Sequence, residues 1–400
     1  MYDTEKHQAS LLKQARKSIM FTTNRPDLVF VKGKGSYLWD ATGKKYLDFI
    51  AGWAVCALGH SHPVISSTLK KQSRRLINPS PSFYNEPMIE FARQLTEVSC
   101  LDKVFFVSTG AEANEGAVKL ARKYGRKHLN GAHEIITVWN SFHGRTLAMM
   151  AASGKQNFEP LFLPKPEGFI RVPFNDIKAL KAKVSAKTCA IMLEPVLGEG
   201  GVHLQSPEYL LEVRELCTAH KIPLIFDEVQ TGFGRTGTLF AYEQTGVEPD
   251  IMTLAKGIGN GFPLAALLAK DKFAVFEAGD QGGTYCGTPL ATAVGLAVLT
   301  TIRDERILEN VVKVGVYLEE RLLRLKEQFP VIKEVRGIGL LYAIGLEQEI
   351  ANDIAECCME RRLIVNSANP QTIRFMPALT IGKKEVDAML TILKKVLKSI

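Results

Sequence analysis

The chain has 400 residues, of which 46% are hydrophobic and 23% charged, the composition of a globular protein long enough for two or three domains. Its formal net charge of +8 suits anionic small ligands but is too diffuse to indicate nucleic-acid binding. The seven cysteines are an odd, scattered set without a Cys-x-x-Cys pair, so neither a disulfide framework nor a zinc site is expected.

The N-terminus is polar. The segment from Met1 to His7 carries no apolar signal core, and no apolar run in the chain approaches the ~20 residues that span a bilayer. We therefore expect a cytoplasmic protein that does not associate with membranes.

Short alternating runs between Leu28 and Ile50 predict a small β-meander, since glycines divide them at Gly33, Gly35 and Gly43. His60 and His62 follow and invite a metal-binding interpretation. No third ligand comes at a recognisable spacing, so turn formation or capping before a helix from Pro63 is favoured.

From about residue 63 strands and helices alternate at the spacing of an α/β fold. The run Val104 to Val107 predicts a buried strand, and Ser108 opens a helix that is expected to end near Gly125. A polar turn that leads into a helix presents free N–H groups to an anion. A simple N-cap is the alternative, and a Walker loop is excluded because no Gly-Lys-Ser/Thr follows.

The next two strand-end loops carry candidate binding residues. A strand from Glu134 to Trp139 precedes Phe142 and Arg145, a pair that suits a planar ring and a carboxylate. The alternatives are core packing for Phe142 and a surface ion pair for Arg145. After a strand from Cys189, Glu194 is interpreted as structural, whereas Glu199 lies between two glycines and is interpreted as functional.

Two apolar runs end in opposite charges. Leu224 to Phe226 ends at Asp227, and Ile251 to Ala255 ends at Lys256, where open α/β sheets place their chemistry. Strand-end charges that face water are the alternative. A lysine amine can form a Schiff base with the aldehyde of pyridoxal phosphate, which also needs an anion at its ring nitrogen. The glycines after Lys256 let a ligand approach closely.

The last hundred residues change character. An amphipathic helix is predicted from about Leu308 to Gln328, then a strand over Leu340 to Ile344 and a helix around Ala351 to Glu360. Arg374 lies inside a later apolar run and therefore needs a partner, which a structural ion pair could supply.

From about Leu28 to Ile381 these motifs resemble the class III (fold type I) pyridoxal-phosphate aminotransferases. The resemblance implies an α/β fold with a large domain, residues 61–289, built on a mainly parallel seven-stranded-type sheet. Residues 1–60 and 290–400 would form a smaller α+β domain. The cofactor would lie between the domains of a homodimer with shared active sites.

The resemblance also assigns roles to residues. It implies that Lys256 binds pyridoxal 5'-phosphate and moves the proton, and that Asp227 supplies the anion at the ring. The other implied cofactor-binding residues are Gly110 and Ala111 at the phosphate, Phe142 stacked on the ring, Gln230 at the ring hydroxyl, and Thr284 at the phosphate of the partner subunit.

The implied substrate-binding residues are Arg145, Glu199, Gly283 and Arg374. Arg145 would hold a carboxylate of either substrate, and Arg374 only the α-carboxylate of glutamate. Glu199 would cover Arg374 when the other donor is bound, because a bare buried arginine is costly.

The implied activity moves the terminal amino group of N-acetylornithine, or of a similar ω-amino donor, to 2-oxoglutarate, as in arginine biosynthesis. The segments Ala57 to Pro63 and Phe83 to Pro87 are close to the form found in acetylornithine-specific members. Ornithine, succinylornithine and 4-aminobutyrate remain alternative donors, because several residues depart from the usual pattern, namely Trp53, Cys56, Leu197, Cys286 and Thr288. An aminomutase or racemase on the same scaffold, or a protein that only binds the cofactor, are the alternatives from other classes.

Overall fold

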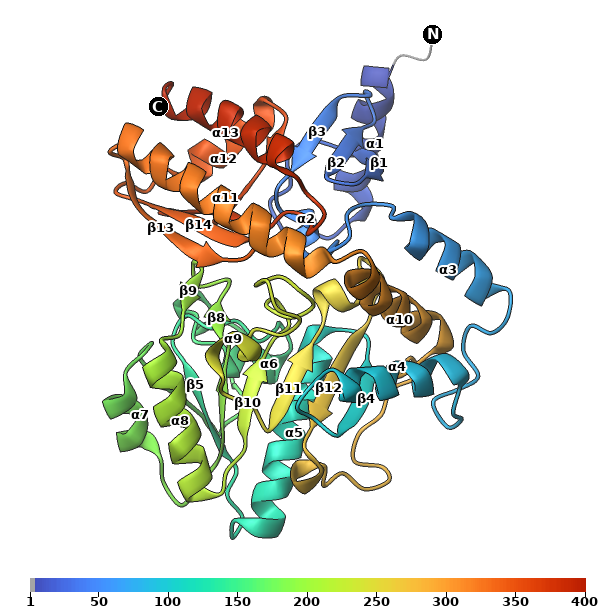
Figure 1. Ribbon diagram of the computed structural model, residues 1–400, viewed down its shortest axis with the longest axis vertical. Helices are drawn as coiled ribbons and strands as arrows, with labels where there is room; N and C mark the ends of the chain where they lie inside the picture. Colours follow the sequence, from blue (N-terminus) through green and yellow to red (C-terminus); the bar gives the residue numbers. More distant parts are fainter. Residues whose placement is uncertain (1–3) are drawn as a thin grey trace.

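A seven-stranded sheet forms the lower part of the molecule in Figure 1. The computed structural model describes residues 4–400, so residues 1–3, the start of the polar N-terminus, lie outside the described part. Six strands run parallel and only β12 is reversed, which confirms the mainly parallel sheet predicted from the sequence. The strands in spatial order are β4 (Lys103–Val107), β12 (Ala265–Ala269), β11 (Ile251–Leu254), β10 (Leu224–Asp227), β7 (Thr188–Leu193), β5 (Glu134–Val138) and β6 (Phe169–Val172).

Both faces of this sheet are buried, because successive side chains of a strand point to opposite faces. In β10, Ile225 packs into a cluster with α5 (Gly110–His128), whereas Leu224 and Phe226 pack into a cluster that contains side chains of α8 (Pro207–His220). The other helices around the sheet are α3 (Pro63–Ser73), α4 (Glu86–Glu97), α6 (Leu147–Ala152), α7 (Ile177–Lys183) and α10 (Pro289–Asp304). The continuous apolar runs seen in the sequence follow from this burial.

The helix predicted to end near Gly125 continues to His128. Gly125 is fully inside the helix, and a Cβ atom there would lie 2.1 Å from the Ala132 carbonyl oxygen and 2.8 Å from Cβ of Cys189. The prediction was wrong because this glycine serves a close approach between α5 and its neighbours rather than the end of the helix.

The upper part in Figure 1 combines both ends of the chain. The predicted meander is formed by β1 (Phe30–Lys34), β2 (Tyr37–Asp40) and β3 (Lys45–Asp48), and β15 (Leu363–Ile364) adds to β3 in parallel. Beside it lies an antiparallel sheet in the order β13 (Ile332–Ile338), β14 (Leu341–Leu346), β17 (Thr372–Phe375) and β16 (Asn366–Asn369). The pairing of β15 with β3 is what joins the two ends.

Helices cover these small sheets. The two helices predicted there are α11 (Ile307–Gln328) and α12 (Ala351–Glu360), and α13 (Lys383–Leu397) packs on both. The sequence did not predict α1 (Thr4–Ser18), which has no buried residue and so lacks an apolar stripe. The division into domains 61–289 and 1–60 with 290–400 remains a prediction. No helix within residues 4–400 has the length and apolar character needed to cross a membrane.

Candidate active site

The loops that leave the carboxyl ends of five strands enclose a cavity of about 410 Å³. Parallel strands bring their carboxyl ends to one edge of a sheet, and β4, β5, β7, β10 and β11 all point the same way. The residues that line it include Gly110, Ala111, Asn114, Phe142, His143, Arg145, Glu194, Glu199, Asp227, Gln230 and Lys256.

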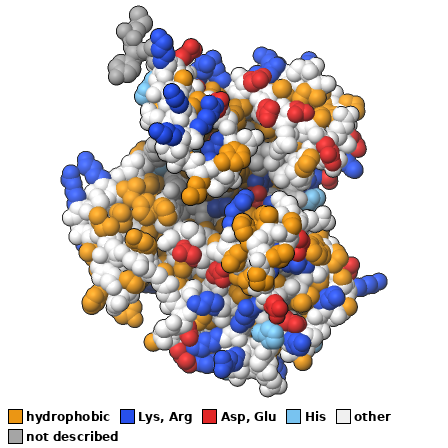
Figure 2. All heavy atoms as spheres, turned by 180° about the vertical axis from the view of Figure 1, so that it is seen from behind, with side chains coloured by type: hydrophobic (Ala, Val, Ile, Leu, Met, Phe, Trp, Pro, Cys, Tyr) orange, Lys and Arg blue, Asp and Glu red, His pale blue; other side chains and the backbone are white. Residues whose placement is uncertain are grey.

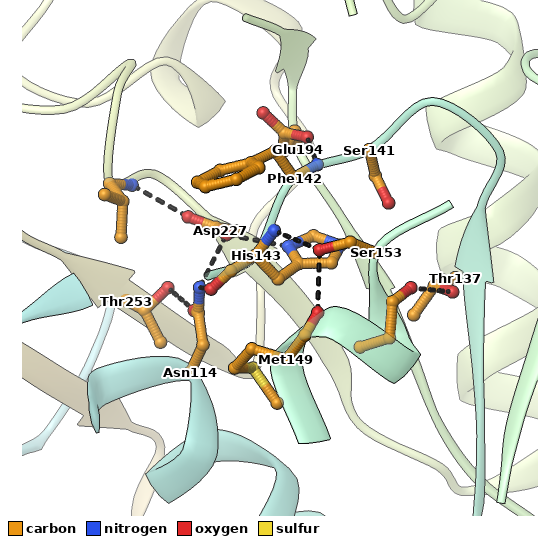
Figure 3. Close-up of polar contacts among 12 residues, drawn as sticks. Asn114, Thr137, Ser141, Phe142, His143, Met149, Ser153, Glu194, Asp227 and Thr253 are labelled. Atoms are coloured by element: carbon orange, nitrogen blue, oxygen red, sulfur yellow. Dashed lines mark hydrogen bonds and ion pairs between the residues drawn. The ribbon is translucent and has the colours of Figure 1, made fainter. Parts of the chain in front are cut away.

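Asp227, the last residue of β10, is a buried carboxylate held by three donors (Figure 3). Its Oδ2 atom accepts hydrogen bonds from Nδ1 of His143 and Nδ2 of Asn114, each at 2.7 Å. Its Oδ1 atom accepts from the Val229 amide at 3.0 Å. Because each donor fixes one direction, the carboxylate has a single orientation at the floor of the cavity.

Sequence reasoning missed His143 and Asn114. Burial lowers the pKa of His143, but the hydrogen bond and charge of Asp227 outweigh it, so the pKa lies above its ordinary value. Asn114 is fixed in turn by the Thr253 hydroxyl, which donates to its Oδ1 at 2.6 Å. Figure 3 shows this chain from Thr253 through Asn114 and Asp227 to His143. The only sequence signal was the histidine between Phe142 and Arg145.

Lys256 lies in the same cavity, two residues after the end of β11. Its φ of +50° is a left-handed conformation that costs a non-glycine residue about 1–2 kcal/mol. Burial lowers the pKa of its amine, and the Arg374 charge acts in the same direction, against the carboxylates of Glu199, Asp227 and Glu194. A lowered pKa raises the fraction of neutral amine, which is the nucleophilic form.

The N-terminus of α5 faces the cavity. The amides of Gly110 and Ala111 occupy the first two helical positions, and no group in residues 4–400 accepts a hydrogen bond from them. Thr109 caps the helix in a reciprocal pair with Glu112, so the N-cap interpretation also holds. The cap satisfies the Glu112 amide and leaves the two earlier amides available to an anion.

Phe142 and Arg145 project from the loop after β5. The Phe142 amide donates to Oε1 of Glu194 at 2.8 Å, which fixes the loop, and burial raises the pKa of Glu194 to about 7. Arg145 is exposed and makes no ion pair with any described residue, so the surface ion pair considered from the sequence is wrong. Its guanidinium lies 6.0 Å from the centroid of the Phe142 ring.

Arg374, in β17, has no solvent exposure and is fully partnered. Its Nη2 lies 2.7 Å from Oε1 of Glu199, and its other bonds go to the Gly198 carbonyl and to Oδ1 of Asn366. Gln230 approaches the same guanidinium with Oε1 at 3.3 Å. The structure therefore brings together Glu199 and Arg374, which lie far apart in the sequence.

Three predicted residues do not line this cavity: Arg374, which Glu199 covers, and the pair Gly283 and Thr284. Gly283 and Thr284 are exposed on the loop before α10, and the Thr284 carbonyl accepts from Asn78 at 3.2 Å. Neither is among the residues that line the cavity of its own chain. Their expected roles stay predictions about a neighbouring subunit.

The histidines near residue 60 have other contacts than those expected. His60 Nε2 lies 2.7 Å from Oδ2 of Asp48, which together with Cys56 raises the pKa of His60 to about 10. The predicted helix begins at Pro63 with His62 at its N-cap position, but the His62 side chain makes no capping hydrogen bond. Among residues 4–400 no group of three or more His, Cys, Asp or Glu side chains could hold a metal ion.

The residues present fit pyridoxal phosphate. The amide of Gln230 is buried with its Nε2 atom unpartnered, which leaves a donor for a ligand oxygen. The unpaired amides of Gly110 and Ala111 suit a phosphate, the Asp227 carboxylate suits a protonated ring nitrogen, and the Lys256 amine suits an aldehyde. A parallel sheet with this set at its carboxyl edge defines a pyridoxal-phosphate-dependent transferase of fold type I.

The chain belongs to the class III aminotransferases, which use pyridoxal phosphate, since the family model "Aminotransferase class-III" matches residues 20–397. It is 51% identical over 390 residues to an acetylornithine aminotransferase of Ralstonia nicotianae, covering 96% of this chain and 98% of that protein. It is 46% identical over 391 residues to an acetylornithine aminotransferase of Caldanaerobacter subterraneus, covering 98% of this chain and all of that protein. The ornithine aminotransferase structure from Toxoplasma gondii superposes with a TM-score of 0.94 at 32% identity, covering 98% of this chain and 95% of that one.

Proposed function

We propose that this aminotransferase moves the terminal amino group of N-acetylornithine to 2-oxoglutarate, giving an aldehyde and glutamate, as in arginine biosynthesis. The observation that carries the proposal is the Glu199–Arg374 pair at 2.7 Å beside a cavity that contains Lys256 and Asp227. A covered arginine suits an enzyme whose two amino donors differ in whether they carry a carboxylate next to the reacting amine. The names of the relatives support acetylornithine as the first donor.

Four groups of this chain would hold the cofactor. The amides of Gly110 and Ala111 would bind its phosphate, Asp227 its ring nitrogen, Gln230 its ring hydroxyl and Phe142 the face of its ring. When bound, pyridoxal phosphate supplies an aldehyde that condenses with amines and a ring that withdraws electrons from the substrate carbon.

The remaining chemistry belongs to protein groups. With the cofactor bound, the Lys256 amine would remove the proton from the substrate carbon as a general base and return it as an acid. Its lowered pKa brings it closer to the range in which one group can do both at neutral pH. Asp227 holds the positive charge at the ring nitrogen, and His143 and Asn114 keep that carboxylate in place.

The two arginines would sort the substrates. Arg145 has no partner carboxylate in the described chain, so it is free to bind the carboxylate of acetylornithine or the distal carboxylate of glutamate. Glu199 covers Arg374 while acetylornithine is bound and leaves it for the α-carboxylate of glutamate or 2-oxoglutarate. In the enzyme without substrate, the ion pair with Glu199 keeps the buried Arg374 from being left without an anion.

We also propose a homodimer in the cytoplasm. Thr284 and Gly283 are exposed in one subunit, so a second subunit would bring them to the cofactor phosphate and substrate of its partner. Figure 2 shows apolar side chains gathered on the face opposite to that of Figure 1, to the side of the hollow between the upper and lower parts. Exposed apolar residues over α4 and the segment before it include Leu76, Ile77, Phe83, Tyr84 and Ile89, which suits an interface. The seven free cysteines suit a reducing compartment.

A donor panel tests the proposed function. Purified enzyme with 2-oxoglutarate is offered acetylornithine, succinylornithine, ornithine and 4-aminobutyrate, and glutamate formed is measured. We expect the highest kcat/KM with acetylornithine. A higher value for another donor would replace acetylornithine, and product formed without 2-oxoglutarate would indicate an aminomutase or racemase instead.

A further inference from the structure

Lys155 shares the Glu199 carboxylate with Arg374 and has no part in the proposed reaction. It follows Gly154, which bridges to Trp139 at the end of β5, and the Asn140 amide donates to the Gly154 carbonyl at 2.9 Å. A Cβ atom on Gly154 would lie 2.4 Å from Cα of Trp139, so the backbone is held tightly against the strand end. The base of the Lys155 side chain is therefore fixed relative to the active-site loop.

Glu199 lies between two cations. Its Oε1 atom is 2.7 Å from Nη2 of Arg374, and its Oε2 atom is 3.9 Å from Nζ of Lys155. Each oxygen faces a different partner, and the Glu199 side chain is only 24% exposed. Burial alone would raise the pKa of Glu199, but the charges of Arg374, Lys256 and Lys155 hold it at about 2, so Glu199 is ionised at neutral pH.

Within the described residues Lys155 has no other carboxylate at ion-pair distance. Its side chain is 22% exposed. Its Nζ also makes a cation–π contact with the Phe142 ring, whose centroid lies 5.2 Å away. Burial lowers the pKa of Lys155, and the charge of Glu199 opposes that shift. At ion-pair distance, the Glu199 carboxylate is thus shared by two cations, Arg374 and Lys155.

Resting on the proposed function, we propose that Lys155 is the alternative partner of Glu199 and a positioning residue for the glutamate half of the reaction. When the α-carboxylate of glutamate or 2-oxoglutarate takes the Arg374 guanidinium, the Glu199 carboxylate moves from Arg374 to Lys155. The arriving anion then completes a second ion pair, and every charge in the cluster is matched. Without Lys155 the displaced carboxylate would stay in a largely buried place with no partner, which is costly.

In this arrangement only one class of substrate depends on Lys155. Acetylornithine leaves Glu199 on Arg374 and needs no alternative partner, whereas dicarboxylates with an anion at Arg374 need one. Lys155 therefore favours five-carbon dicarboxylates over ω-amino donors without touching either of them.

The substitution Lys155→Met keeps the length of the side chain and removes its charge. The enzyme is studied with cofactor bound, and glutarate, which has both carboxylates of glutamate but no amine, is titrated by calorimetry. We expect affinity for glutarate to fall about tenfold. The Lys155–Glu199 pair is partly buried, so its loss should cost more than that of an exposed ion pair and less than that of a fully buried one. The single-turnover rate with glutamate should fall, and that with acetylornithine should stay within about twofold. Lys155→Arg should restore most of the glutarate affinity.

Lys165→Met is the matched control, because Lys165 is a half-buried lysine of the same loop, paired with Glu159 at 3.0 Å. It should leave glutarate affinity unchanged. In a Glu199→Gln background Lys155→Met should have no further effect on glutarate, since the carboxylate to be received is gone.

Equal losses with both donors, or a glutarate effect that persists in the Glu199→Gln background, would overturn the role of Lys155. If Lys155→Met does not fold by circular dichroism, Lys155→Gln makes the same comparison. If the wild-type enzyme binds glutarate but does not turn over acetylornithine, the proposed donor is refuted. The glutarate affinities of the wild type and of Lys155→Met would still test the role of Lys155.

Discussion

His143 and Asp227 are joined by a buried hydrogen bond of 2.7 Å between Nδ1 of the imidazole and Oδ2 of the carboxylate. An ionised Asp227 can only accept, so Nδ1 of His143 carries a proton. The other ring nitrogen, Nε2, has no partner among the described residues. The pair thus holds the Asp227 carboxylate in one orientation at the cavity, with the imidazole as its support.

Replacing Asp227 by Asn should leave the protein folded but catalytically weak. The Asn oxygen can still accept from His143 and Asn114, but its NH2 group would then face the Val229 amide donor, and the side chain carries no charge. We expect the half-reaction rate with either donor to fall about 10²–10³-fold, as when a charge-stabilising group is removed. Stopped-flow absorbance measures it, and a rate equal to that of the wild type would refute the electrostatic role.

Lys256→Ala should abolish turnover and retain the fold. The lysine has a strained backbone and a lowered pKa but no hydrogen bond that a truncation would break within residues 4–400. The loss should reach several orders of magnitude because nucleophile and base are the same group. Turnover is measured as glutamate formed, with near-ultraviolet circular dichroism as the folding control. Retention of a tenth of wild-type activity would be incompatible with the assignment.

Glu199→Ala should shift preference between donors. Removing the carboxylate uncovers Arg374, so a donor with an α-carboxylate at the reacting end meets a free guanidinium. We expect the glutamate half-reaction to be unchanged or faster and the acetylornithine half-reaction to be slower. Single-turnover rates with both donors decide the matter, and an equal loss with both would make Glu199 merely structural.

Thr284→Ala should weaken cofactor binding and the dimer together. The hydroxyl is exposed in one subunit and is expected at the phosphate of the other. Loss of one hydrogen bond to a charged group should cost about 1.5–3 kcal/mol. Equilibrium dialysis of the cofactor and analytical ultracentrifugation measure the two effects. Cofactor affinity equal to that of the wild type would count against a contact across subunits.

Glu194→Gln should change how stability depends on pH. Burial raises the pKa of Glu194 to about 7, against about 4.5 in the unfolded chain, so the folded state keeps a proton that the unfolded state releases between these values. This stabilisation is present below about pH 4.5 and is lost as pH rises through about 7. The free energy of unfolding of the variant lacks this decrease with pH, so the stability of the variant relative to wild type should increase from about pH 5 to about pH 8. Urea unfolding at several pH values measures it, and parallel curves would contradict the raised pKa.

The sequence predicted the strands and the two central charges well. Asp227 and Lys256 each end an apolar run, and the parallel pairing of β10 with β11 brings such ends to the same edge of the sheet. Arg374 was recognisable because a charged residue inside an apolar run needs a partner, and the partner is Glu199 as expected.

The supporting residues could not be predicted in the same way. Asn114 lies inside a helix, and Lys155 lies in a polar loop, so nothing local distinguishes either from a solvated side chain. Their positions depend on how α5 and the loop after α6 pack against β10 and β17, which no periodicity encodes. The contacts of Thr284 depend on a second chain and are equally beyond local pattern.

The parallel pairing of β15 with β3 has a consequence for synthesis of the chain. Leu47 of β3 pairs with Leu363 of β15, so this ladder joins the first eighth of the chain to its last tenth. A ribosome releases the N-terminal meander long before its fourth strand exists, while the large sheet can already form. The meander then presents an open edge until the last residues emerge, and unpaired strand edges invite pairing with other chains. Nascent chains stalled before residue 363 should therefore depend on chaperones more than the finished protein does.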